Sequence, residues 1–212
     1  MYGTDTRQEE SEVTEQLRNL GQAAVMLTKK CNLQLSGNNY EFNPSSFSQG
    51  GASVGCLHSY PFHDQAVLGF CSGALIGDRY VSTAGHCITR ENCGTVAFVF
   101  GATNTQVETG QFPTNSVFFC DELVARSDTN SNGVSVDFAV VKLDRVVETS
   151  VATPVPVRLT TKATLGENVL LVGFPYGLPK KYDSDALVNY VGSDSGAYYH
   201  WYAPFDAFGG NS

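Results

Sequence analysis

The sequence predicts an all-β fold, and three observations lead to this expectation. Apolar residues with a helical period are scarce, short runs rich in Val, Ile, Phe and Tyr recur along the chain, and Gly, Asn, Asp and Ser separate these runs. With 212 residues, of which 42% are hydrophobic, the chain is long enough to bury a sizeable core and too apolar to be disordered.

The elements follow in order. Thr14 is a suitable N-cap for a short helix that runs through Leu20. Residues 32–55 are rich in Asn, Ser and Gly and are expected to form a long surface loop, and prolines within 151–156 predict a linker. The predicted strands are residues 23–28, 66–76, 80–84, 96–101, 117–124, 138–143, 169–174 and 197–203.

Composition excludes several classes of protein. A net charge of −8 without a basic stripe argues against a nucleic-acid partner, and no run of 18 apolar residues is present to span a membrane. Six cysteines suit an oxidising compartment and three disulfides, although six cysteines allow 15 pairings. The first residues lack the charged and apolar regions of a signal peptide, so we expect a secreted protein whose signal peptide is absent from this chain.

The most informative stretch is FCSGALIGDRYVSTAGHC, residues 70–87. It predicts a β-hairpin that ends in a sharp turn directly before His86, because Ala84 and Gly85 are small. A disulfide between Cys71 and Cys87 would close a loop of about 16 residues and fix the backbone beside the histidine. The simpler interpretation is an ordinary, partly buried histidine between structural cysteines.

A second stretch, SVDFAVVKLDR, places Asp137 at the start of a strongly apolar run. A carboxylate drawn towards a core needs a partner, and an imidazole can supply one by donating from Nδ1–H while Nε2 stays available as a base. A carboxylate that caps a turn at the start of a strand is the alternative.

The chain ends in DAFGGNS, where two glycines and an asparagine form a tight turn in front of Ser212. AGHC, DFAVVKL and GGNS, in this order, resemble the His, Asp and Ser segments of the chymotrypsin-like (trypsin-fold) serine peptidases. The similarity is greater to the bacterial-type branch related to glutamyl endopeptidases, in which GFPYGLP (173–179) has a counterpart. The resemblance implies two antiparallel six-stranded β-barrels with the active site between them.

The domain boundaries expected from this resemblance are an N-terminal extension at 1–22, a first β-barrel at 23–150 and a partial second barrel at 151–212. By the same resemblance Ser212 is the nucleophile, His86 the general base and acid, and Asp137 the residue that orients the imidazole. The backbone N–H groups of Gly210 and Ser212 form the oxyanion hole. Ser195, in GSDSGA, is the alternative nucleophile, but Ser193 stands where the oxyanion-hole glycine is expected.

Members of the family continue beyond the nucleophile, so we expect a truncated second barrel and an inactive 212-residue chain. Asp206 lies six residues before Ser212, the offset at which trypsin-like enzymes place the acidic residue of the primary pocket, which implies cleavage after Arg or Lys. The alternative is that Asp206 caps a turn. Asn211 cannot form the ion pair with a freed N-terminal amine that activates trypsin zymogens.

Two further disulfides are expected. Cys93 and Cys120 border two apolar runs that can pair as neighbouring strands, and Cys31 with Cys56 follows by elimination. A metal site is a weak alternative, because its candidate ligands match no usual zinc spacing and would break the Cys71–Cys87 pair; these candidates are Cys56, His58, His63 and Cys71. We expect neither metal nor cofactor.

The sequence therefore predicts a secreted, monomeric serine endopeptidase that acts on polypeptides. The alternative is a catalytically silent homologue that keeps the fold as a binding module. His200 lies among tyrosines and Trp201 and is expected to belong to an aromatic strand.

Overall fold

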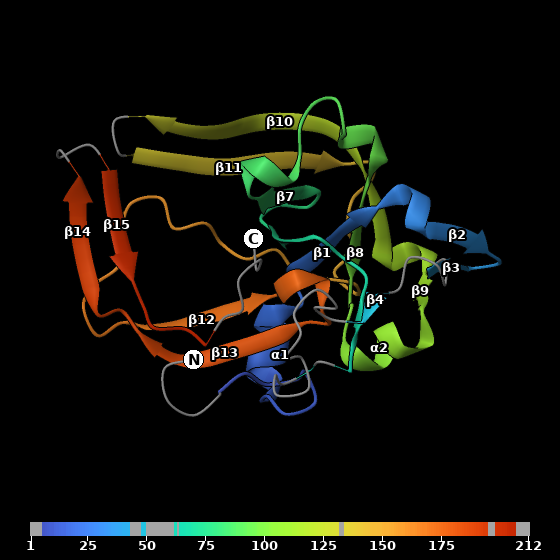
Figure 1. Cartoon of the computed structure of the whole chain (residues 1–212), viewed down its shortest axis with the longest axis horizontal. Helices are drawn as coiled ribbons and strands as arrows, with labels where there is room; N and C mark the ends of the chain where they lie inside the picture. Colours follow the sequence, from blue (N-terminus) through green and yellow to red (C-terminus); the bar gives the residue numbers. More distant parts are fainter. Residues whose placement is uncertain are drawn as a thin grey trace.

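The computed structural model describes residues 6–42, 48–49, 62, 64–131, 134–194 and 198–206. Its centre is a closed antiparallel barrel of six strands in the order β1-β6-β7-β11-β10-β8 (Figure 1). These strands are β1 (Ala24–Lys29), β6 (Cys71–Leu75), β7 (Tyr80–Thr83), β8 (Val96–Phe100), β10 (Val117–Ser131) and β11 (Val134–Leu143). The predicted all-β class is confirmed.

The barrel strands are apolar because several are buried on both faces. Along β1, Val25 and Leu27 point into the barrel core, whereas Met26 packs on a second cluster outside the barrel. The second cluster includes Phe112 and Phe174, which pack against the outward-facing side chains of the barrel, such as Met26. Two-sided burial explains why β1 and β8 appear in the sequence as continuous apolar runs without alternation.

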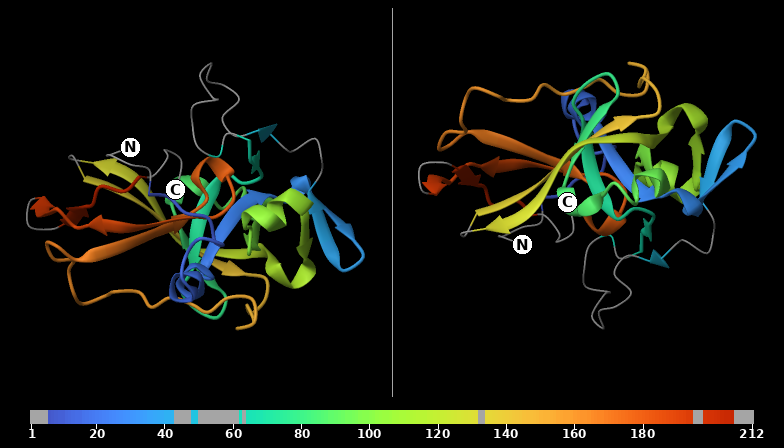
Figure 2. Two further views of the ribbon diagram at one scale, coloured as in Figure 1. Left: turned by 90° about the horizontal axis from the view of Figure 1, so that it is seen from below. Right: turned by 90° about the horizontal axis from the view of Figure 1, so that it is seen from above.

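Shorter elements lie around and beyond the barrel. The β2–β3 hairpin projects from the end of the molecule opposite to β14 and β15 (Figure 2). The remaining strands are β2 (Leu33–Ser36), β3 (Asn39–Phe42), β4 (Ser48–Gln49), β5 (Ala66–Val67), β9 (Gln111–Pro113), β12 (Asn168–Gly173), β13 (Lys181–Leu187), β14 (Tyr190–Asp194) and β15 (Tyr198–Tyr202). The helices are α1 (Glu15–Gly21), α2 (Asn104–Thr109) and the 3₁₀ turns η1 (Lys30–Asn32), η4 (Gly85–Cys87), η5 (Cys93–Thr95), η6 (Thr114–Ser116) and η7 (Pro175–Gly177).

Several sequence predictions hold. Thr14 caps α1 as expected, since its hydroxyl accepts a hydrogen bond from the Leu17 N–H at 3.4 Å. The runs that precede and include Cys120 pair with β8 as neighbouring strands. β15 carries His200, which stacks on Tyr190 with ring centroids 5.6 Å apart, so the predicted aromatic strand is also present.

The single strand predicted at 66–76 is wrong. The chain forms β5 and β6 and bends between them at Gly69, where a Cβ would lie 2.5 Å from the Met26 side chain. The Leu68 and Gly69 N–H groups donate to the Gly177 carbonyl instead of to a barrel strand. The turn of the GFPYGLP motif therefore docks on this bend and attaches the second half of the chain to the barrel.

The loop predicted at 32–55 is also wrong in its first part, where β2 and β3 form a hairpin around Gly37, at φ +58°. The two strands at 117–124 and 138–143 are longer than predicted, because β10 and β11 continue as a polar ribbon beyond the barrel (Figure 1). Backbone pairing and polar side-chain contacts hold this ribbon, so the apolar pattern could not reveal its length. β13 was missed because its residues are mostly polar.

Besides the barrel, the described residues form the three-stranded sheet β2-β3-β9 and the two-stranded sheets β4–β5, β12–β13 and β14–β15, and no second closed barrel. The N-terminal segment packs on β13: Gln8 and Tyr182 form a β-bridge with N–H···O distances of 2.9 and 3.0 Å. The predicted division of the chain at residue 150 stays a prediction.

Candidate active site

His86 lies on the turn η4, directly after β7. The turn packs closely on the β10–β11 ribbon, because a Cβ on Gly85 would lie 2.0 Å from the Ser127 carbonyl oxygen and 2.9 Å from that of Phe138. Only glycine allows this approach. The residue before the histidine therefore has a packing reason to be glycine, in addition to its place in the turn.

The disulfide between Cys71 and Cys87 joins β6 to the same turn, with Cα atoms 6.2 Å apart. Cys93 and Cys120 form the second disulfide, so both of these predicted pairs are confirmed. Cys31 is exposed and bonds to no described cysteine, whereas Cys56 lies outside the described residues. The Cys31–Cys56 pair stays a prediction.

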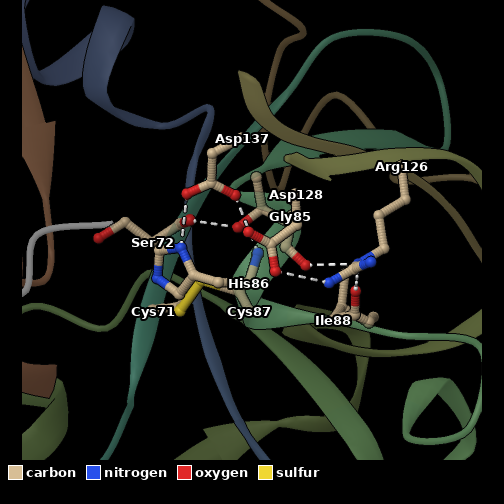
Figure 3. A network of polar contacts seen from close by, with 10 residues as sticks. Cys71, Ser72, Gly85, His86, Cys87, Ile88, Arg126, Asp128 and Asp137 are labelled. Carbon is tan, nitrogen blue, oxygen red and sulfur yellow. Dashed lines mark hydrogen bonds and ion pairs between the residues drawn. A yellow bond between two sulfur atoms is a disulfide. The ribbon is translucent and has the colours of Figure 1, made fainter. Parts of the chain in front are cut away.

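The structure brings His86 and Asp137 together from positions 51 residues apart in the sequence (Figure 3). Asp137 Oδ2 lies 2.6 Å from His86 Nδ1, and Asp137 Oδ1 accepts a hydrogen bond from the His86 backbone N–H at 2.9 Å. One carboxylate thus holds both the ring and the backbone of the histidine. A carboxylate at Nδ1 favours the tautomer that carries its proton there, so that Nε2 is left as the basic nitrogen.

Electrostatics at this pair favour the ionised carboxylate. Partial burial by itself would raise the pKa of Asp137, but the hydrogen bonds from the His86 ring and from the His86 and Gly85 N–H groups outweigh it and lower that pKa. The side chain of His86 is 46% exposed to solvent, and that of Asp137 is 33% exposed. The pair is therefore fixed in geometry yet accessible from solvent.

A hollow of about 730 Å³ opens beside His86. The Cys71–Cys87 disulfide and Phe70 form an apolar part of its wall, and Lys29 and Lys30 line it as well. A polypeptide segment lying in this hollow would contact the imidazole.

Arg126 and Asp128 complete the polar network of Figure 3 and were missed by the sequence analysis. Arg126 bonds to backbone carbonyls of the His86 turn and to the Asp128 carboxylate. The predicted strand ended at Val124, so neither residue had been assigned a side of a sheet. The i, i+2 spacing of opposite charges was the available signal, since these positions share a face of a strand.

Asp206 is buried, with 5% of its surface exposed. Its carboxylate accepts hydrogen bonds from the Thr6 N–H at 3.1 Å and the Thr6 hydroxyl at 3.3 Å, and its own N–H donates to Asp183 at 2.6 Å. Burial raises the pKa of Asp183. The residue predicted to define the primary pocket thus lies between the N-terminal segment and β13.

Other predicted site residues lie outside the described residues: Ser195, Gly210, Asn211 and Ser212. Three candidates for the alternative metal site, Cys56, His58 and His63, also lie outside them. The fourth candidate, Cys71, is bonded to Cys87 and has no thiolate to offer a metal.

Comparison with known proteins places this site in a family. Residues 56–193, about two thirds of the chain, match the family described as trypsin. The chain belongs to the trypsin family. The matched region includes both members of the His86–Asp137 pair and the turn that carries the histidine.

Among solved structures, the chain is similar to human heparin binding protein, with a TM-score of 0.54 and 14% sequence identity. This match covers 88% of the present chain and 66% of the other, so the present chain spans slightly less than two thirds of that protein's length. At such an identity the likeness shows the shared fold alone. No curated protein matches the chain. Within the described part of the trypsin-family chain, no helix is long and apolar enough to cross a membrane.

Proposed function

We propose that this trypsin-family protein is a secreted serine endopeptidase that hydrolyses polypeptides through a Ser212–His86–Asp137 triad. The observation that carries the proposal is the 2.6 Å contact between Asp137 and His86 Nδ1, made by a carboxylate that also accepts the His86 backbone N–H. An ordinary surface histidine would need no such support at both ring and backbone.

In the proposed mechanism the Ser212 hydroxyl attacks the scissile carbonyl carbon while His86 Nε2 takes its proton. Asp137 stabilises the resulting imidazolium, and the N–H groups of Gly210 and Ser212 bind the oxyanion. His86 then protonates the leaving amine, which leaves an acyl-enzyme ester at Ser212. Water, activated by His86, hydrolyses this ester and regenerates the serine.

We further propose cleavage after Arg or Lys, with Asp206 as the acidic residue of the primary pocket. The offset of Asp206, six residues before Ser212, supports this role, and a substrate cation that reached this buried carboxylate would be stabilised more strongly than one at an exposed carboxylate. Thr6 holds the carboxylate by two hydrogen bonds and would have to share it with the substrate. The GFPYGLP turn supports a relation to the branch that includes the glutamyl endopeptidases, so a preference for Glu is the competing outcome.

The test is covalent labelling of the full-length gene product by a fluorophosphonate probe, combined with the hydrolysis of Arg, Glu and Phe peptide substrates. Ser212→Ala abolishes labelling, and Asp137→Asn lowers kcat by about 10⁴-fold because the imidazole loses its oriented tautomer. Ser195→Ala is the matched control and keeps full activity. A folded protein that labels nowhere is instead the silent homologue, and labelling that depends on Ser195 refutes the assigned nucleophile.

A further inference from the structure

The backbone of the His86 turn is held by one guanidinium group. Arg126 Nε–H donates to the Gly85 carbonyl at 2.7 Å and to the Ile88 carbonyl at 2.9 Å (Figure 3). Gly85 directly precedes His86, and Ile88 follows two residues later. Arg126 therefore fixes both ends of the turn that carries the imidazole.

The same arginine also binds one of the two carboxylates that lie near the histidine. Asp128 and Asp137 are direct partners in the β10–β11 register, so their side chains lie on one face of the ribbon, and Arg126 shares that face two residues along β10. Two carboxylates directly opposite each other repel. Arg126 Nη2 binds Asp128 at 2.9 Å, and the His86 ring binds Asp137 at 2.6 Å, so each carboxylate has its own partner.

We propose that Arg126 is a positioning residue for the His86–Asp137 pair. It ties the histidine turn to the ribbon that carries Asp137, and it engages Asp128, which leaves Asp137 as the carboxylate that the imidazole contacts. Its importance for catalysis rests on the proposed function, but its effect on the geometry of the pair does not. A short hydrogen bond between groups on two different elements depends on how firmly these elements are joined.

The chain offers a matched control in Arg145. Its Nη2 donates to two backbone carbonyls, those of Thr114 at 2.7 Å and Val117 at 2.6 Å, and its Nη1 binds Asp144 at 3.1 Å. This arrangement repeats that of Arg126 at carbonyls that are not part of the histidine turn. A purely structural role would make the two arginines equivalent.

The test measures the tautomer of His86 by long-range ¹H–¹⁵N correlation in the 212-residue chain, at a pH well above the ordinary imidazole pKa of about 6.5. Wild type and Arg145→Met show mainly the Nδ1–H form. In Arg126→Met, the ratio of the Nδ1–H to the Nε2–H form falls by about threefold or more. Arg126→Lys keeps a cation at the same place and restores most of the ratio.

Asp128→Asn provides a second variant if Arg126→Met does not fold. It frees the other end of the guanidinium and shifts the ratio in the same direction by a smaller factor.

In an active full-length protein, Arg126→Met lowers kcat by about 10- to 100-fold with KM within about twofold, because the misplaced base affects the chemical step. An unchanged tautomer ratio in the folded Arg126→Met or Asp128→Asn variant, or an equal shift in Arg145→Met, overturns the proposal. If the ratio shifts but the protein has no hydrolase activity, the positioning role stands and the proposed function fails.

Discussion

Replacing Glu9 by Gln should destabilise the protein far more than the change of one surface residue would. Lys181 on β13 has a side chain only 4% exposed, and its ammonium lies 2.9 Å from the Glu9 carboxylate. Gln65 closes a triangle, since it accepts from Lys181 at 2.7 Å and donates to Glu9 at 2.7 Å. Burial lowers the pKa of Lys181, and the charge of Glu9 opposes this effect.

The expected magnitude follows from this burial. Removing one member of a buried ion pair leaves a desolvated charge and costs about 3–5 kcal/mol. The Glu9 side chain is 16% exposed, so we expect a loss of stability at the lower end of this range, about 3 kcal/mol. For a chain of this length, that corresponds to a decrease in Tm of about 6–12 °C.

The assay is urea unfolding followed by far-UV circular dichroism, with the m-value compared between variants. Glu167→Gln, which breaks the exposed Arg158–Glu167 pair, is the control and should leave the midpoint nearly unchanged. The double variant Glu9→Gln/Lys181→Met should recover most of the lost stability, because an apolar side chain of similar length replaces the buried cation. A Glu9→Gln variant as stable as wild type, or a double variant whose loss is the sum of the two single losses, would show that the pair is not coupled in the way described.

Three further outcomes are expected. Gly85→Ala destabilises the protein by about 2 kcal/mol or more in urea unfolding, because the added Cβ overlaps a strand carbonyl. Gly94→Ala is the control and has little effect, because a Cβ at this position meets nothing within 4 Å. Equal effects of the two substitutions would contradict the packing argument. Removing the Cys71–Cys87 disulfide by a double alanine substitution costs about 3 kcal/mol, and an unchanged midpoint would refute this. Burial raises the pKa of Asp183, so just above the ordinary carboxyl pKa the native state keeps a proton that the unfolded chain has lost. The free energy of unfolding therefore falls as the pH rises through that window. Asp183→Asn flattens this decline in unfolding curves recorded at a series of pH values, and an unaltered decline would assign it to another group.

The N-terminal segment shows why part of the fold was not predictable. Within the expected N-terminal extension at 1–22, Glu10 binds the buried ammonium of Lys180, at a separation of 170 residues, and also the Tyr182 hydroxyl. Polar residues such as Lys180 and Lys181 indicate a solvated segment unless their partners are known. β13 could therefore not be recognised from its own residues.

By itself, the sequence determined the all-β class, most of the apolar strands of the barrel and two disulfides, and its resemblance to the trypsin-fold peptidases selected His86 and Asp137. The strands depend on local pattern, because apolar runs pair in order to be buried, whereas the choice of His86 and Asp137 depended on the order of three short motifs that resemble those of the family. Only the tertiary structure decided that Arg126 holds the His86 turn and that Glu9 and Glu10 neutralise buried lysines. These contacts join residues that are distant in the sequence, and their energies arise from burial and geometry that exist only after the chain has folded.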